Sequence, residues 1–146
     1  MSAALGLPYS REFFLNIMAR DVPIGTRAEV SQVVEKRHTL AAVNPELPPV
    51  LTTPQMIGWM EFACWQAQQP FCDGGETTVG TAIHVDHRAP TMIGQNVTAE
   101  AVLEKVEGRF YIFRVKAWNE SYPIGSGTVH RAVVNVGKFM SKQQIL

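Results

Sequence analysis

The segment from Thr52 to Gln69 constrains the fold more than any other part of the chain. It reads Thr-Thr-Pro-Gln-Met-Ile-Gly-Trp-Met-Glu-Phe-Ala-Cys-Trp-Gln-Ala-Gln-Gln. Its apolar residues point in almost every direction around a helix axis, and a helix of that kind is buried on nearly all sides rather than laid on a surface. The segment therefore predicts one helix with the rest of the domain wrapped around it.

Pro54 marks the start of this helix, because proline is favoured at the first helical position, where its missing N–H costs nothing. We therefore predict Thr53 as the N-cap and a helix that runs to about Gln69. If Thr52 is the N-cap instead, Gln55 completes a capping box with it. In either register, Thr53 lies at the positive end of the helix dipole.

Five other segments have the composition of β-strands. They are residues 26–34, 77–88, 96–106, 109–119 and 125–136. Glu107 and Gly108 predict a tight turn between the third and fourth of these segments, which should therefore pair antiparallel. One strand, one helix and four further strands follow an α+β order, without the strand–helix–strand alternation of a parallel sheet. We predict a strongly curved antiparallel sheet of about five strands around one long central helix.

The connection between the first strand and the helix, residues 38–49, contains Asn44, Pro45, Pro48 and Pro49. This composition predicts a loop without helix, because proline removes a hydrogen-bond donor and restricts the residue before it. A second connection, residues 71–75, is predicted to be a turn.

The whole chain, residues 1–146, is predicted to be a single domain with an N-terminal arm over about residues 1–24. Its 46% hydrophobic and 18% charged residues are typical of a globular protein with one core. Lysine plus arginine and aspartate plus glutamate both number 13, which argues against binding to nucleic acid or an anionic membrane. Because neither a signal peptide nor a long apolar stretch is evident, we expect a soluble, cytoplasmic protein whose two cysteines stay reduced.

Glu61 is the one carboxylate in the predicted helix, and it shares a side with Ile57, Cys64 and Gln68. Burial of an ionised carboxylate without a partner is costly. Glu61 therefore either caps a backbone group at a solvent or subunit boundary, or it takes part in chemistry.

His87 ends a strand in which the period of two places it on one face with Thr81, Ile83 and Val85. It should point toward the helix, either as a structural core histidine or as a partner of Glu61. His84 faces the opposite side of the strand, so the two histidines cannot converge on one ion, and we predict no metal site.

Gly80 and Arg131 are two further candidates. A glycine in a strand most often marks a bulge or turn, but it also lets a ligand approach a backbone N–H closely, as an oxyanion site requires. Arg131 lies in an apolar row with Val129 and Val133. It is expected to reach the sheet edge, to pair with Glu61, or to bind phosphate.

Several short motifs, taken in order, resemble the hotdog-fold acyl-CoA thioesterases, and most closely the fluoroacetyl-CoA thioesterase-like family. The resemblance covers roughly residues 50–139. The motifs are residues 50–53, 61–64, 75–76, 79–83, His87, 124–128 and 131–133. The catalytic threonine, glutamate and histidine of the family match Thr53, Glu61 and His87, its oxyanion-binding glycine matches Gly80, and its active-site arginine matches Arg131.

The resemblance implies a homodimer with active sites at the subunit interface, with the pairing of dimers into tetramers left open. It also implies hydrolysis of a short-chain or small acyl-CoA to the free acid and CoA, without a cofactor. Glu61 would then act either as general base or as nucleophile. His87 would polarise Thr53 or Glu61, or protonate the departing thiolate.

Members selective for fluoroacetyl-CoA carry phenylalanines before the threonine as a lid over the acyl group. Here the equivalent stretch, Asn44 to Pro49, has no aromatic residue. We therefore predict a different small acyl group, carried on CoA or on protein-bound pantetheine. A non-catalytic protein that binds acyl-CoA or another small ligand, and an enoyl-CoA hydratase or dehydratase of the same fold, are the alternative functions.

Overall fold

The computed structural model describes residues 21–145 and contains one five-stranded sheet. Its elements, in chain order, are β1 (Arg27–Val33), η2 (Lys36–His38), α2 (Leu40–Val43), α3 (Thr53–Gln68), η3 (Gln69–Phe71), β2 (Glu76–His87), β3 (Asn96–Glu107), β4 (Phe110–Trp118), β5 (Pro123–Asn135) and α4 (Val136–Ile145). Most of the predicted N-terminal arm lies outside the described residues. Among those residues, no helix is long and apolar enough to cross a membrane.

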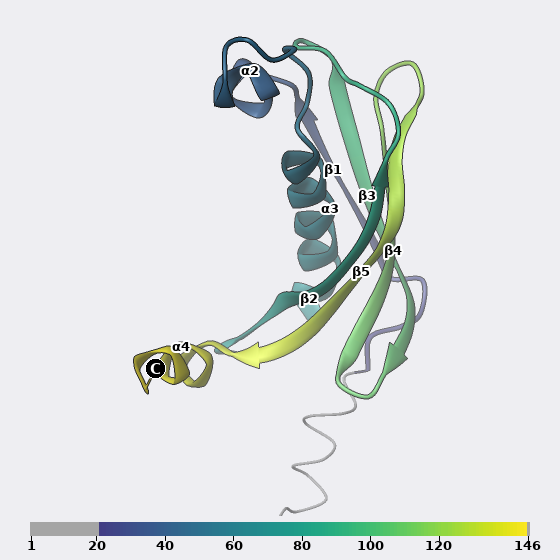
Figure 1. Ribbon diagram of the computed structural model, residues 1–146. Coiled ribbons are helices and arrows are strands. Elements are labelled where there is room, and N and C mark those ends of the chain that lie inside the picture. The colour runs from purple at the N-terminus through teal and green to yellow at the C-terminus, as the bar shows by residue number, and fades with distance from the viewer. Residues whose placement is uncertain (1–20, 146) are drawn as a thin grey trace, which may run out of the picture.

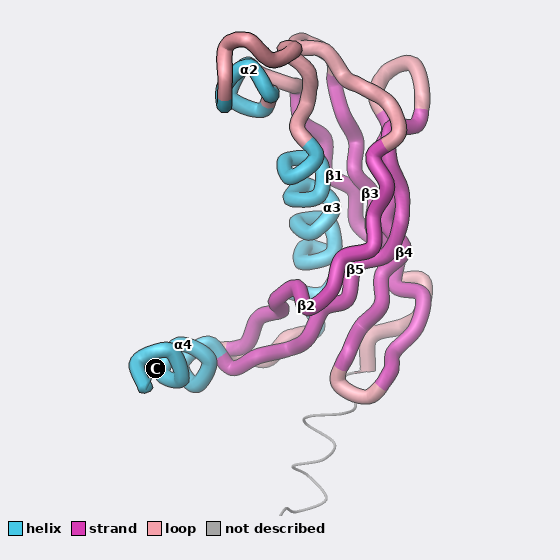
Figure 2. The backbone as a smooth tube through the Cα atoms, in the orientation of Figure 1, coloured by secondary structure: helices cyan, strands magenta, loops and turns pink. Residues whose placement is uncertain are grey.

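The sheet has the strand order β1-β3-β4-β5-β2, and every neighbouring pair is antiparallel. It curves strongly, and α3 lies in the concave side (Figures 1 and 2). The predicted α+β hotdog arrangement is confirmed. In a single copy of the chain, β1 and β2 form the two edges of the sheet.

The core lies between α3 and the concave face of the sheet. Met56, Met60 and Ala63 of α3 are fully buried there. The middle of β4 alternates in the way a strand with one covered face requires, with Phe113 and Val115 in the core and Arg114 and Lys116 exposed.

One side of α3 is not covered by its own chain. Phe62 is 51% exposed, and its ring stacks on that of Trp65. The expectation that the helix is wrapped on nearly all sides therefore holds only for the sides that face the sheet. The open side faces away from β1, β3 and β4.

α3 begins one residue earlier than predicted. Thr52 is the N-cap, and its hydroxyl accepts a hydrogen bond from the Gln55 N–H at 3.2 Å. The first proposal, with Thr53 as cap, is wrong, and the alternative register is the correct one. Pro54 consequently occupies the second helical position. A backbone N–H at that position would have no intrahelical acceptor, so its absence in proline still costs nothing.

The sequence predicts no helix in the connection over residues 38–49, and this prediction is wrong. α2 forms a single turn that is closed by a hydrogen bond from the Asn44 N–H to the Leu40 carbonyl. The prolines all lie after this turn, so they end it without preventing it. η3 likewise occupies the start of the predicted turn at 71–75.

The strands agree with their predicted ranges to within two residues, and the β3–β4 hairpin turns at Gly108 as expected. Gly108 has φ +59°, a left-handed conformation that favours glycine. The simple alternation predicted for β2, however, is interrupted. Its pairing with β5 shifts between Gly80 and Ala82, so that Thr81 is an extra residue in a β-bulge.

Candidate active site

Thr53 is the first residue of α3, His87 is the last residue of β2, and their side chains are hydrogen-bonded. Thr53 Oγ1 lies 2.8 Å from His87 Nδ1. Because Thr52 supplies the cap, the Thr53 hydroxyl is not used to cap the helix. Within one chain His87 is therefore paired with Thr53, and not with Glu61 as one interpretation of the sequence had it.

The charge state of His87 suits it to accept a proton. Burial lowers the pKa of His87 from its ordinary value, and a backbone hydrogen bond with Ala89 opposes this effect. The imidazole is therefore neutral at neutral pH. In that state Nδ1 can accept the hydroxyl proton of Thr53.

A small apolar cavity adjoins this pair. It has a volume of about 280 Å³, and Leu40, Val50 and Leu51 line it together with Thr53 and His87. Leu40 comes from α2, so this short helix forms part of the cavity wall. The cavity can hold a compact apolar group next to the threonine hydroxyl.

Glu61 lies two turns further along α3, where it faces β2 and β5. Its Oε1 is 3.8 Å from Arg131 Nη1, and 36% of the Glu61 side chain is exposed. Arg131 is buried and is held in place by Thr78, since its Nη2 donates to the Thr78 carbonyl at 2.8 Å and to the Thr78 hydroxyl at 3.0 Å. Of the three roles considered for Arg131, the geometry favours a partner for Glu61.

The charge on Arg131 is retained. Burial lowers the pKa of Arg131 from its ordinary value, while Cys64 and Glu61 oppose that shift. A guanidinium remains protonated at neutral pH even so. A fixed positive charge therefore stands beside an ionisable carboxylate that solvent can reach.

Gly80 lies directly against the Glu61 carboxylate. A Cβ atom at this position would come within 2.3 Å of Glu61 Oε1 and 3.5 Å of Arg131 Nη1. Any residue other than glycine at this position would displace the Glu61 carboxylate. The Glu61 carboxylate occupies the space that a side chain at this position would fill.

Replacing Gly80 with alanine is expected to lower kcat by about 100-fold for the thioester hydrolysis that the resemblance implies. The added methyl group displaces Glu61 and obstructs approach to the Gly80 N–H, an effect comparable to the loss of one oxyanion donor. Thiol release and thermal unfolding should be measured for both the variant and Gly74→Ala, whose Cβ meets no atom within 4 Å. A Gly80→Ala enzyme as active as the Gly74→Ala control would exclude this role for Gly80.

Cys64 is not a candidate nucleophile. It is fully buried on α3, and burial raises the pKa of its thiol to about 12. The thiol is therefore neutral at neutral pH. It acts as a small core residue.

The candidate residues form two groups in one chain, which we call the Thr53–His87 half-site and the Glu61–Gly80 half-site. Thr53 and Glu61 are eight residues apart, and at 1.5 Å per residue this separates them by about 12 Å along α3. Gly80 and His87 are likewise apart on β2, where Gly80 lies next to Glu61 and His87 next to Thr53. A single copy of the chain does not bring the two half-sites together.

The geometry gives no sign of a metal centre. In the part of the chain that the structure describes, no three histidine, cysteine, aspartate or glutamate side chains are placed to hold an ion. His87 faces α3, whereas the His84 ring contacts that of His130 at a centroid distance of 5.8 Å. The two histidines of β2 thus serve different faces of the sheet, as predicted.

The sequence did not indicate two features that build the site. The bulge at Thr81 lets Gly80 and His87, which are an odd number of positions apart, both face α3. Thr78, which fixes Arg131, was not among the candidates. Gly80 was the available signal for the bulge, because glycine within a strand often marks one.

Comparisons with known proteins show the family of the chain. The model of the family described as fluoroacetyl-CoA-specific thioesterase matches residues 34–137. The fluoroacetyl-CoA thioesterase of Streptantibioticus cattleyicolor is 41% identical over 125 residues, which cover 82% of this chain and 90% of that protein.

Two solved structures extend the comparison. A variant of the fluoroacetyl-CoA-specific thioesterase in complex with fluoroacetate and CoA is 41% identical, covers 80% of this chain and 98% of its own, and superposes with a TM-score of 0.75. A thioesterase superfamily member from Thermus thermophilus is 29% identical, covers 86% of this chain and 93% of its own, and has a TM-score of 0.79.

The fold is that of the hotdog thioesterase superfamily. Within that superfamily, the match over most of the chain is to one family. The chain belongs to the fluoroacetyl-CoA-specific thioesterase family.

Proposed function

We propose that this protein hydrolyses the thioester bond of a small acyl-CoA, and that two copies of the chain together form each active site. The relative from Streptantibioticus cattleyicolor, 41% identical over most of both chains, supports the hydrolysis of acyl-CoA. The observation that supports a shared site is the separation of the Thr53–His87 half-site from the Glu61–Gly80 half-site. Neither half-site contains all of the groups that thioester hydrolysis requires.

The edge strand β2 offers the means of joining the half-sites. A second β2 can add to it antiparallel, as exposed strand edges tend to do. If a two-fold axis passes near Ile83 and His84, halfway between Gly80 and His87, then Gly80 lies beside the partner subunit's His87. Each dimer would contain two such composite sites.

The side chains near that axis fit an interface between two copies. Ile83 is 37% exposed although it lies on the α3 side of the strand, and Phe62 is exposed on the open side of α3. Apolar and aromatic side chains are enriched at the buried centre of homodimer interfaces. A second α3 would cover the side that its own chain leaves open.

In the composite site, each group has a task in thioester hydrolysis. The half-exposed Glu61 carboxylate either takes a proton from the water that attacks the acyl carbon, or attacks that carbon itself to form a mixed anhydride, which water then hydrolyses to the free acid. The Gly80 N–H and the Arg131 guanidinium stabilise the negative charge that develops on the carbonyl oxygen. When the C–S bond breaks, CoA leaves as a thiolate.

The other subunit contributes the Thr53–His87 pair to the composite site. The Thr53 hydroxyl, at the positive end of the α3 dipole, orients the thioester carbonyl or the attacking water. The neutral His87 accepts a proton through Thr53 and can return it to the departing thiolate.

The acyl group is proposed to be short but not fluoroacetyl. The cavity of about 280 Å³ beside Thr53 is walled by the aliphatic residues Leu40, Val50 and Leu51. The segment that follows α2, residues 44–49, contributes no aromatic side chain to cover a fluoroacetyl group. A cytoplasmic location stays a prediction from the sequence.

A panel of acyl-CoA thioesters tests the proposed reaction through the release of free thiol. We expect turnover of acetyl-, propionyl- or butyryl-CoA, with kcat/KM for fluoroacetyl-CoA within about tenfold of that for acetyl-CoA, because small changes in an apolar group alter binding little. A preference of several orders of magnitude for fluoroacetyl-CoA would contradict the proposed specificity. Inertness toward every thioester, or loss of enoyl absorbance without thiol release, would contradict hydrolysis.

A further inference from the structure

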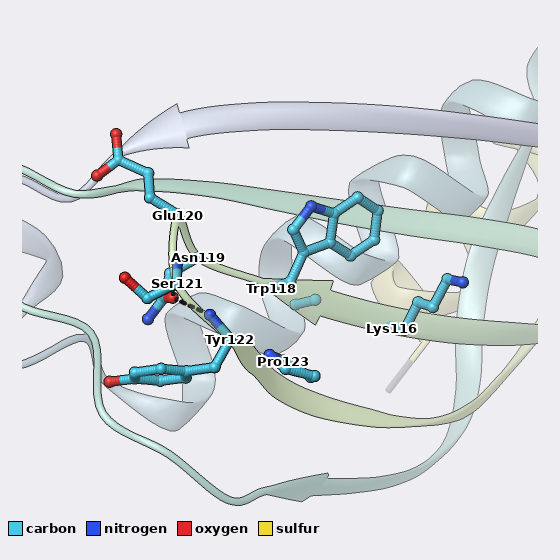
Figure 3. A pocket seen from close by; sticks show the side chains of 8 residues that line it. Lys116, Trp118, Asn119, Glu120, Ser121, Tyr122 and Pro123 are labelled. Atoms are coloured by element: carbon cyan, nitrogen blue, oxygen red, sulfur yellow. Dashed lines mark hydrogen bonds between the residues drawn. The ribbon is translucent and has the colours of Figure 1, made fainter.

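A second cavity among the described residues lies outside both half-sites, at the turn between β4 and β5. Its volume is about 440 Å³, and residues 116–123 line it. Figure 3 shows the side chains of Lys116 and Trp118 together at one end of the cavity, with Glu120 and Tyr122 at the other. Neither half-site uses any of these residues.

Lys116 and Trp118 provide an aromatic face and a cation at the same place. They are two residues apart on β4, and Lys116 Nζ lies 5.8 Å from the centre of the Trp118 ring. Lys116 Nζ is also 3.4 Å from Glu100, but that carboxylate already has a closer partner in Arg27. An anion placed over the tryptophan would share the lysine charge with Glu100, whose other carboxylate oxygen contacts Arg27.

The far wall of the cavity is fixed by hydrogen bonds. The Asn119 side-chain oxygen accepts from the backbone N–H groups of Ser121 and Tyr122 at 2.8 and 2.9 Å. Its amide nitrogen donates to the Thr91 hydroxyl at 3.2 Å. The turn is consequently tied to the segment that follows β2, and the cavity is preformed.

This cavity adjoins the one beside Thr53. The Tyr122 hydroxyl donates to the Pro90 carbonyl at 2.5 Å. Pro90 in turn lines the small cavity that contains Thr53 and His87. A long ligand whose reactive end lies at Thr53 can thus pass over Pro90 and reach Trp118 with its other end.

We propose that the cavity at residues 116–123 binds the adenosine 3′,5′-bisphosphate end of the CoA thioester, with the purine stacked on Trp118 and a phosphate bound by Lys116. This inference rests on the proposed function, because it assigns the second end of the same substrate. A planar ring and an adjacent cation are the features that recognise a purine nucleotide. The pantetheine arm would span the edge formed by Pro90.

Binding of adenosine 3′,5′-bisphosphate, measured by calorimetry, tests the site without any need for turnover. We expect Trp118→Ala and Lys116→Gln each to weaken binding by about tenfold, the effect of losing one stacked base or one phosphate contact. Lys105→Gln is the matched control, since Lys105 is equally exposed and also bridges to a glutamate. No binding to the wild type, or equal binding to all four proteins, would overturn the proposal.

Kinetics with two substrates distinguish a cavity that binds the nucleotide end of CoA from one that binds a free nucleotide. Both variants should raise KM about tenfold for an acyl-CoA but leave kcat and KM unchanged for the same acyl group on pantetheine, which lacks the nucleotide. Unchanged turnover of the pantetheine thioester also shows that the variants are folded. If nucleotide binding is weakened but KM for acyl-CoA is not, the cavity binds a free nucleotide and this proposal is wrong.

Discussion

Replacing Glu61 with glutamine is expected to lower kcat for thioester hydrolysis about 1,000-fold, within the range that general acid–base groups contribute. Glutamine has nearly the same volume and shape, so the substitution removes the charge while leaving the packing of α3 in place. Glu61 is 36% exposed and 3.8 Å from Arg131. Loss of that ion pair should therefore alter the free energy of unfolding by only about 0–1 kcal/mol.

The combination of a large kinetic effect and a small change in stability distinguishes chemistry from a structural role. Thiol release and thermal unfolding should be compared with Glu29→Gln, an exposed glutamate on the opposite sheet edge that also pairs with an arginine. The control should match the wild type in both measurements. A Glu61→Gln enzyme with full activity, or one whose loss of activity follows its loss of fold, would show that Glu61 does no chemistry.

The architecture was predictable from the sequence because it depends on local patterns. The apolar residues of α3 require a surrounding sheet, and Gly108 fixes the β3–β4 turn through its positive φ. The start of α3 was less certain, since Thr52 and Thr53 both suit the cap position and differ by one residue. α2 was missed because the prolines that follow it dominate the composition of the loop.

The candidate residues were found from the sequence, but their partners depend on tertiary structure. Periodicity placed His87 on the α3 side of β2, but it could not show that the Thr53 hydroxyl would be its partner. Strict alternation along β2 would put Gly80 and His87 on opposite faces, and the bulge at Thr81 turns Gly80 toward Glu61. The spacing of Thr53 and Glu61 along α3 already separates these two residues, but the pairing of His87 with the first and of Gly80 with the second depends on the path of β2.

Mixing two inactive variants tests the central claim, a site shared between two copies of the chain, most directly. Glu61→Gln damages one half-site and His87→Ala the other. Equal amounts of the two, exchanged into heterodimers, should regain about 25% of wild-type thiol release, because half of the dimers are mixed and each has one intact composite site. As control, Glu61→Gln mixed with Gly80→Ala should regain none, since both changes fall in the same half-site. No recovery in the first mixture would contradict the shared site and place all the catalytic groups in one chain.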